Sequence, residues 1–320
     1  MDTPQLVTVF GGSGFVGTQL VQALARAGHR VRVAVRRPDL AGHLRPLGAV
    51  GQIQLVQANV RDTASVAAAV RGAGVVVNLA ATGHEHGKQR FRAINVAGAR
   101  RVAEAARAAG AGRLVHMSVL GADAASPSAF ARSRALGEAE VQQAFPGAVI
   151  CRPAVIFGAG DTFFNRLGWL ARTLPVMPVF SGKTRLQPVY VGDVAEALSA
   201  AVRGEAKPGR VYELGGPDVE TYRALVERVL AAANRRRPIL ALPGAIGTLV
   251  ALPLGVLPRP LVTPDQLRLL SVDTVVSAEA VKDKRTLAGL GIGAPRPLEA
   301  VLPFYLWRFS PNGQFDRQTA

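Results

Sequence analysis

Cysteine is nearly absent from this sequence, since Cys151 is the only one among 320 residues. One thiol cannot form an internal disulfide or build a thiolate zinc site, so we expect a reducing compartment. Acidic residues are also few: 22 aspartates and glutamates stand against 38 lysines and arginines, which gives a net charge of +16. This excess predicts an acidic partner, such as a phosphorylated ligand, an anionic lipid or an acidic protein surface.

Lysine is rare as well, and the arginines are scattered along the chain instead of forming one basic arm. The sequence has no signature of a nucleic-acid-binding module, so we do not expect a nucleic-acid partner. Hydrophobic residues make up 49% of the chain and charged residues 19%, a composition typical of a folded protein.

The sequence has little that resembles a membrane or export segment. Its longest uncharged run, 238–258, could span a bilayer by length, but its prolines and glycines make a poor transmembrane helix. Three arginines precede this run, so residues 235–262 are a candidate peripheral membrane contact; a buried lobe core and a protein-binding patch are the alternatives. We expect no signal or transit peptide, because the first strand is predicted from about Gln5.

A glycine-rich loop joins a predicted strand at 7–10 to a predicted helix at 15–27. In such a loop the first glycine permits a tight turn, the second lets the backbone approach a pyrophosphate, and the third lets the helix pack closely. The N–H groups at the start of the helix then bind the diphosphate. We therefore predict a dinucleotide site, rather than a strained empty turn, at Gly11, Gly12, Ser13, Gly14, Phe15, Val16 and Gly17.

Strands and helices alternate through the first 150 residues. Further strands are predicted at 31–35, 53–56, 75–79, 113–117 and 148–151, and helices at 63–71, 91–109 and 129–144. Continuous apolar strands between helices indicate a parallel sheet covered on both faces. We predict an α/β fold with a Rossmann-type doubly wound parallel sheet, whose ligand lies beyond the carboxyl ends of the strands.

The alternation becomes less regular after about Phe157, where shorter predicted helices follow one another. We predict an NAD(P)-binding Rossmann domain over 1–180, with 181–205 packing back near it. Residues 206–320 are predicted to form a smaller, partly interleaved C-terminal lobe that contacts a substrate or a partner.

Two arginines, Arg36 and Arg37, follow the second predicted strand, and no carboxylate occurs before Asp39. An acidic residue near this position would bind the ribose hydroxyl of NAD, whereas arginine suits the 2′-phosphate of NADP. We therefore predict NADP(H) in preference to NAD(H), with solvated loop arginines as the alternative. The other predicted cofactor contacts are Asn59, Val60, Leu79, Ala80, Ala81, Ser118, Arg134, Pro153 and Val155.

Five motifs, in their order along residues 5 to 200, resemble the extended and atypical short-chain dehydrogenase/reductase superfamily. They are the glycine loop, Asn95-Val96-Ala97-Gly98, His116-Met117-Ser118, Arg152-Pro153-Ala154-Val155-Ile156-Phe157-Gly158 and Tyr190-Val191-Gly192-Asp193-Val194. The resemblance implies a catalytic tyrosine, with a lysine four residues later that lowers the pKa of the phenol and binds the nicotinamide ribose.

That catalytic pair is missing. Phe130 stands in the place of the tyrosine and Arg134 in the place of the lysine, and no Tyr-x-x-x-Lys occurs anywhere in the chain. Phenylalanine has no proton to exchange, and arginine is a fixed cation that can still hold ribose hydroxyls. Ser118 lies near the catalytic serine of the superfamily, but Leu120 is an equal candidate for that position. We therefore assign no catalytic residue.

Within the superfamily, a narrower resemblance reaches to about residue 285. The segments 126–128, 163–166, 183–194 and 261–266 look like those of the NADPH-binding accessory subunits of respiratory complex I and their bacterial relatives. This resemblance implies a tightly bound NADPH that is not turned over, complex I subunits or assembly intermediates as partners, and a location that is cytoplasmic or peripheral on the cytoplasmic face of a bacterial inner membrane. The alternative is an active NADP-dependent oxidoreductase or epimerase, with a substrate that could be related to quinones.

The sequence His84-Glu85-His86 has the spacing of two metal ligands but lacks a third ligand nearby. We interpret it as a loop and predict no metal site.

Overall fold

The computed structural model describes residues 5–242 and 263–313, and its chain forms two compact units. Of the described residues, unit 1 contains 5–153, 191–214 and 276–293, and unit 2 contains 154–190, 215–242, 263–275 and 294–313. These boundaries differ from the predicted ones at 180 and 206, because 154–190 belongs to unit 2 and 276–293 belongs to unit 1. Which unit contacts a substrate or a partner stays a prediction.

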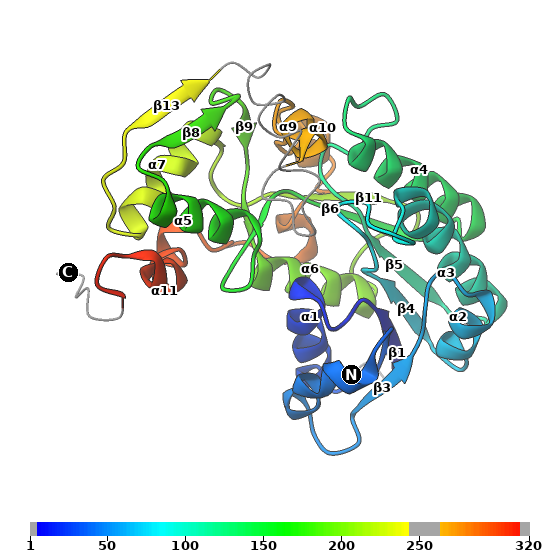
Figure 1. Cartoon of the computed structure of the whole chain (residues 1–320). Coiled ribbons are helices and arrows are strands. Elements are labelled where there is room, and N and C mark those ends of the chain that lie inside the picture. The colour runs from blue at the N-terminus through cyan, green and yellow to red at the C-terminus, as the bar shows by residue number, and fades with distance from the viewer. Residues whose placement is uncertain (1–4, 243–262, 314–320) are drawn as a thin grey trace. The chain divides into compact units, whose positions relative to one another are not determined.

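Unit 1 is built on a parallel sheet that has seven strands among the described residues, in the order β11-β6-β5-β4-β1-β2-β3 (Figure 1). The strand order reverses between β1 and β4, where a doubly wound sheet binds its ligand. The strands are β1 (Leu6–Phe10), β2 (Arg30–Val35), β3 (Ile53–Gln57), β4 (Val75–Asn78), β5 (Arg113–Met117), β6 (Val149–Pro153) and β11 (Val211–Leu214).

Helices cover both faces of this sheet, so the predicted doubly wound α/β class is confirmed (Figure 1). On one face α1 (Phe15–Arg26) packs against α6 (Val191–Arg203). On the other, α3 (Ala97–Ala108) packs against α2 (Thr63–Val70) and α4 (Ala129–Ala144). Alternate strand residues enter the two layers, and Phe10, Val76 and Leu114 belong to the core beneath α2, α3 and α4.

Two segments of unit 1 differ from the predicted elements. The predicted helix over 91–109 begins with a π-helical turn, Arg92–Val96, before α3 starts. A 3₁₀ helix, Pro38–Leu47, follows the two arginines after β2. Hydrophobic periodicity does not distinguish these helix types, because π-helical and 3₁₀ turns depend on local hydrogen bonding.

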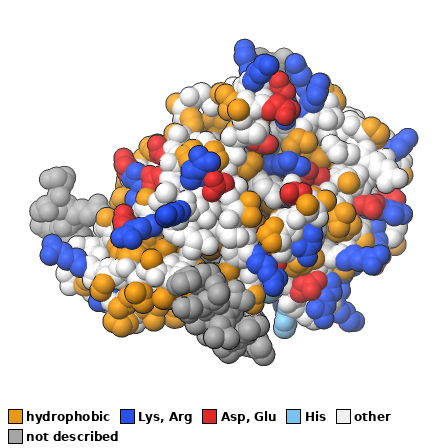
Figure 2. All heavy atoms as spheres, turned by 90° about the horizontal axis from the view of Figure 1, so that it is seen from above, with side chains coloured by type: hydrophobic (Ala, Val, Ile, Leu, Met, Phe, Trp, Pro, Cys, Tyr) orange, Lys and Arg blue, Asp and Glu red, His pale blue; other side chains and the backbone are white. Residues whose placement is uncertain are grey.

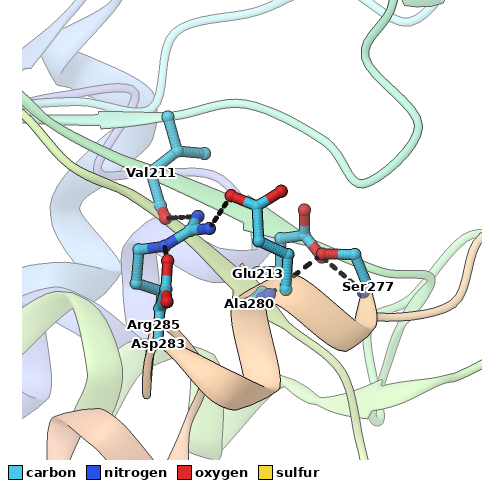
Figure 3. A network of polar contacts seen from close by, with 7 residues as sticks. Val211, Glu213, Ser277, Ala280, Asp283 and Arg285 are labelled. Atoms are coloured by element: carbon cyan, nitrogen blue, oxygen red, sulfur yellow. Dashed lines mark hydrogen bonds and ion pairs between the residues drawn. The ribbon is translucent and has the colours of Figure 1, made fainter.

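Residues 276–293 return to unit 1 along the edge strand β11 through polar contacts (Figure 3). Arg285 donates a 3.0 Å hydrogen bond to the carbonyl of Val211 and pairs with Glu279 and Asp283. The backbone N–H of Ser277, which precedes α10 (Ala278–Lys282), donates a 2.7 Å hydrogen bond to the Glu213 carboxylate. These contacts cover an exposed sheet edge.

Unit 2 is a mixed cluster of short strands and helices with its own core. Its strands are β7 (Ile156–Phe157), β8 (Met177–Phe180), β9 (Arg185–Leu186), β10 (Val189–Tyr190), β12 (Glu220–Thr221) and β13 (Ile239–Leu242). Its helices are α5 (Phe163–Thr173), α7 (Tyr222–Ala232), α9 (Pro264–Leu269) and α11 (Pro303–Leu306), with 3₁₀ turns at Leu298–Ala300 and Trp307–Phe309. Buried Phe164, Leu225 and Leu306 join α5, α7 and α11 in one core.

The predicted membrane contact at 235–262 is only partly described, since 243–262 lie outside the described residues. Its described end forms β13, which pairs in parallel with β8. In the part of the chain that the structure describes, no helix is both long enough and apolar enough to span a bilayer. Lys and Arg side chains are dispersed over the face shown in Figure 2, with acidic side chains between them.

Candidate dinucleotide-binding site

The glycine loop between β1 and α1 lies against the carboxyl end of β4. Gly11 has a φ of +77°, and a Cβ atom on it would lie 3.0 Å from the carbonyl carbon of Leu79 and 3.1 Å from the nitrogen of Ala80. The N–H of Gly14 donates a 3.1 Å hydrogen bond to the carbonyl of Gly11, which closes the turn. The structure thus brings three predicted cofactor contacts together where the strand order reverses.

Helix α1 packs closely on this turn because Gly17 has no side chain. A Cβ on Gly17 would lie 2.4 Å from the carbonyl oxygen of Gly11 and 2.5 Å from the Cα of Gly12. A Cβ on Gly12 would in turn lie 2.6 Å from a methyl group of Val33 on β2. Backbone geometry therefore requires glycine at Gly11, Gly12 and Gly17, whereas a Cβ on Gly14 would meet one atom at 3.3 Å.

The N-terminus of α1 is open to an anion. Its N-cap is Gly14, whose lack of a side chain leaves the first-turn N–H groups without a side-chain cap, and the first turn has no acidic residue. Ser13 and Gly14 are exposed, whereas Val16 is buried. Uncapped N–H groups at the positive end of a helix dipole fit a diphosphate.

The predicted adenosine contacts lie at the ends of β2, β3 and β4. Arg36 and Arg37 are exposed, and Arg37 pairs with Asp39 at 3.1 Å. The side-chain oxygen of Asn59 accepts hydrogen bonds from the backbone N–H and side chain of Arg61, so this oxygen is already engaged within its own loop.

Short apolar side chains follow β3 and β4 at Val60, Ala80 and Ala81. The Val60 side chain lies over Gly98, where an added Cβ would be 3.1 Å away. Ala80 is half-buried and Ala81 is exposed. Asn78 at the end of β4 accepts a hydrogen bond from the N–H of Ala80 and fixes the course of this segment.

Arg134 lies in α4 and is only 2% exposed. Its Nη2 donates to the carbonyl oxygen of Met117, while Nε and Nη1 have no hydrogen-bond partner among the described residues. Burial lowers the pKa of Arg134 to about 10, and the nearby Glu138 carboxylate opposes this shift, so the guanidinium is cationic at pH 7. A buried cation with two unused donor atoms fits hydroxyl or carbonyl oxygens of a bound ligand.

Two more buried polar atoms, at and just after the end of β5, lack a hydrogen-bond partner within the described residues. The hydroxyl of Ser118 and Nε2 of His116 are both buried, and neither has a hydrogen-bond partner among the described residues. Nδ1 of His116 accepts a 3.2 Å hydrogen bond from the Asn78 amide. Burial, and next the charge of Arg134, hold the pKa of His116 well below its ordinary value, so the ring is neutral with its proton on Nε2. Unpartnered buried groups of this kind are rare in proteins and mark a place for a ligand or water.

Phe130 lies one helical turn before Arg134 on α4, in the position where the superfamily has tyrosine. Its half-buried ring packs against Phe91, with 6.0 Å between the ring centroids. The site therefore combines a cation and buried hydrogen-bond donors with an aromatic ring that cannot exchange a proton.

Asn95, which we did not predict as a site residue, joins the loop after β4 to α4. Its side chain bonds both backbone groups of Thr82, at 2.9 and 3.1 Å, and donates a 2.9 Å hydrogen bond to the hydroxyl of Ser133. Gly137 allows this contact, because a Cβ there would lie 2.1 Å from the carbonyl oxygen of Asn95. The motif Asn95-Val96-Ala97-Gly98 pointed to this segment in the sequence. A motif alone does not reveal which of its side chains bridges two segments.

The last two predicted contacts fall in different units. Pro153 ends β6 in unit 1, and its carbonyl accepts a 2.8 Å hydrogen bond from the N–H of Leu120. Val155 belongs to unit 2, where its carbonyl accepts a 2.9 Å hydrogen bond from the N–H of Val189.

The segment His84-Glu85-His86 is engaged in its own loop. Glu85 accepts a 2.8 Å hydrogen bond from the N–H of Phe91, and the backbone of His86 pairs with that of Gln89. Within residues 5–242 and 263–313, His, Cys, Asp and Glu form no group of three that could hold a metal ion.

Known proteins resemble this chain in sequence and in fold. A profile of the NAD dependent epimerase/dehydratase family matches residues 7–215. The chain belongs to this family. The predicted superfamily is thereby confirmed, and a nicotinamide dinucleotide is the cofactor class that it implies; the preference for NADP(H) stays a prediction.

Similarity to curated proteins extends through most of the chain. It is 36% identical over 290 residues to the mitochondrial NADH dehydrogenase [ubiquinone] 1 alpha subcomplex subunit 9 of Arabidopsis thaliana, covering 87% of this chain and 72% of that protein. The Mus musculus subunit 9 is 33% identical over 298 residues, covering 92% and 78%. These matches confirm the predicted resemblance to accessory subunits of complex I. A ceramide reductase of Caulobacter vibrioides is 38% identical over 202 residues, covering 63% and 62%.

Solved structures show the same fold. The UDP-glucuronic acid 4-epimerase of Bacillus cereus superposes with a TM-score of 0.71 at 16% identity, covering 94% of this chain and 98% of that one. At this identity the likeness concerns the fold alone.

Proposed function

We propose that this protein is an NADP(H)-binding, non-catalytic subunit or assembly factor of respiratory complex I. Gly11, Gly14 and Gly17 leave room for a diphosphate at the open end of α1. The exposed Arg36 and Arg37 would bind the 2′-phosphate, and Arg134 would hold the nicotinamide ribose. The nucleotide stabilises the fold and remains bound.

The replacement of the catalytic pair carries this proposal. When bound, a reduced nicotinamide supplies hydride, and carbonyl reduction also requires a proton at the new hydroxyl oxygen. The Phe130 ring, packed on Phe91, has no such proton. Arg134 is cationic and cannot lower the pKa of a phenol that is absent. The site keeps its binding groups and lacks its proton-transfer group.

The proposed partner follows from the relatives. The plant and animal relatives are named as subunits of NADH dehydrogenase [ubiquinone], and the similarity covers 87% and 92% of this chain. We infer that the chain docks on the same type of complex, at the membrane surface where a quinone-reducing enzyme works.

Purification of a tagged full-length chain under mild conditions tests both parts of this proposal. We expect NADPH to be released on denaturation in about one equivalent per chain, and complex I subunits to be enriched. A matched Gly17→Ala variant is expected to lose the nucleotide, because its Cβ would clash with Gly11. Recovery of the wild-type chain without nucleotide and without those subunits would refute the proposal.

An active NADP-dependent reductase is the second candidate, and the ceramide reductase relative favours it. The proton would then come from Ser118 or water, since Ser118 has a buried hydroxyl without a partner among the described residues. Incubation of the NADPH-loaded chain with a ceramide-derived ketone separates the two candidates. Saturable NADPH oxidation with formation of the alcohol would establish the reductase.

A further inference from the structure

An open hollow of about 490 Å³ lies at the C-terminal end of α7 in unit 2. Arginines and apolar side chains share its wall, which is formed by Glu227, Leu230, Ala231, Arg235, Arg236, Arg237, Pro238 and Ile239. Guanidinium groups beside apolar side chains suit a ligand that has an anionic group and a hydrocarbon part.

The positive charge of this hollow is not balanced by neighbouring carboxylates. In the described part of the chain, no ion pair involves Arg172 or the three arginines at 235–237, whereas Glu227 is paired with Arg223 at 3.0 Å. Burial, and then the charges of Arg237 and Arg172, lower the pKa of Arg235. The Arg235 guanidinium therefore lies near those of Arg237 and Arg172, with Arg236 in the same wall and no acidic group paired with any of the four among the described residues.

Backbone contacts hold two of these arginines in place. Nε of Arg235 donates to the carbonyl of Phe309, and Nε of Arg237 donates a 3.2 Å hydrogen bond to the carbonyl of Ala171 at the end of α5. Arg172 and Arg236 are exposed, and their side chains make no hydrogen bond within the described residues. The wall of the hollow thus has two guanidiniums held by backbone carbonyls and the exposed Arg236, while Arg172 lies close enough to Arg235 to lower its pKa.

Exposed aromatic side chains occur on α5 and on residues 303–309, the segments whose carbonyl groups hold Arg237 and Arg235. Phe304, Trp307 and Trp169 are 81%, 41% and 40% exposed. Helices α5, α7 and α11 pack together in unit 2 (Figure 1). The Phe309 ring packs so closely over Gly168 that a Cβ there would lie 2.4 Å from it, and Trp169 lies one turn before Arg172 on α5.

We propose that this arginine hollow binds the phosphate group of an anionic phospholipid at a bilayer surface, with the exposed aromatic side chains in the headgroup layer. Tryptophan concentrates at that layer, and arginine is attracted to anionic lipid. Lipid is a better match than an acidic protein, because apolar side chains share the wall with the arginines and the aromatic rings are exposed. This inference stands whether or not the chain is a complex I subunit.

Flotation of the full chain with vesicles of phosphatidylcholine, with and without phosphatidylglycerol, tests the proposal. We expect binding only to the anionic vesicles. The variant Arg172→Gln/Arg236→Gln removes two exposed charges whose side chains make no hydrogen bond within the described residues, and its partition should fall on the order of tenfold. The control Arg26→Gln/Arg45→Gln removes two exposed charges from unit 1 and should retain nearly full binding.

Tryptophan fluorescence supplies an independent readout, because Trp169 and Trp307 are the two tryptophans of the sequence. Brominated acyl chains should quench their emission on binding. Excess glycerol 3-phosphate should leave vesicle binding intact if a bilayer lipid is the ligand, and abolish it if a free phosphate ester is. Equal losses in both double variants, or binding without quenching, would overturn the proposal.

Discussion

Arg134 reaches from α4 to the carbonyl oxygen of Met117 at the end of β5. This hydrogen bond uses one nitrogen of a fully buried guanidinium and leaves Nε and Nη1 without partners among the described residues. The arginine is therefore held rigidly and still has donors for a ligand. In our account it binds the nucleotide and takes no part in proton transfer.

Replacing Arg134 with methionine should separate nucleotide affinity from stability. The variant loses the hydrogen bonds that a charged donor would make to the nucleotide, so NADPH affinity, measured by calorimetry, should decrease about tenfold or more. The free energy of unfolding without nucleotide should change little or increase, because an apolar side chain replaces an incompletely paired buried cation.

Arg152→Met is the matched control. Arg152 makes a two-point ion pair with buried Glu138, at 2.6 and 2.9 Å. Its loss leaves a buried carboxylate unpaired and should lower the free energy of unfolding by about 3 kcal/mol. Equal destabilisation by the two variants would contradict a ligand-binding role for Arg134.

Arg36→Gln should weaken NADPH binding about tenfold and leave NADH binding unchanged, because only NADPH carries the 2′-phosphate. Arg37→Gln should have a smaller effect, since Arg37 is already paired with Asp39 at 3.1 Å. Titration of both nucleotides by fluorescence measures the two affinities. A parallel loss of NADH affinity would show that Arg36 does not read the phosphate.

Gly17→Ala should destabilise the chain by about 1–3 kcal/mol in urea unfolding, because its Cβ would overlap the turn at Gly11 and Gly12. Gly42→Ala is the control: an added Cβ there has no atom within 4 Å and its φ is not positive. If both variants unfold at the same urea concentration, α1 does not depend on close packing at Gly17.

His116 should make the chain less stable in mild acid. Because burial holds its folded pKa below the unfolded value of about 6.5, the unfolded chain takes up a proton that the folded chain does not. Stability should therefore decrease by about 1.4 kcal/mol per pH unit below pH ~6.5. Urea unfolding of the wild type and of His116→Gln between pH 7 and 5 measures this slope, which the variant should lose. The control His43→Gln changes an exposed histidine and should keep the slope of the wild type.

The sequence predicts well those parts of the fold that depend on local pattern. Glycine spacing identified the β1–α1 turn, because contacts under 3 Å at Gly12 and Gly17 admit no side chain. Apolar strands between helices identified the parallel sheet. Helix α7 begins only at Tyr222, because Glu220 and Thr221 pair with β9, and local pattern does not show such a pairing.

Other features depend on contacts between distant segments and have no local signal. The pairing of β13 with β8 and the return of 276–293 to β11 through Arg285 are examples. The resemblance indicated the position of Arg134 but not its complete burial, since arginine is rarely buried in full.

The central claim is that this chain holds NADPH without oxidising it. Its most direct test loads the purified chain with one equivalent of NADPH and follows absorbance at the nicotinamide band while quinones and ceramide-derived ketones are added. We predict that bound NADPH is lost no faster with these substrates than in a substrate-free control. Rapid oxidation that saturates with any one substrate would contradict the account.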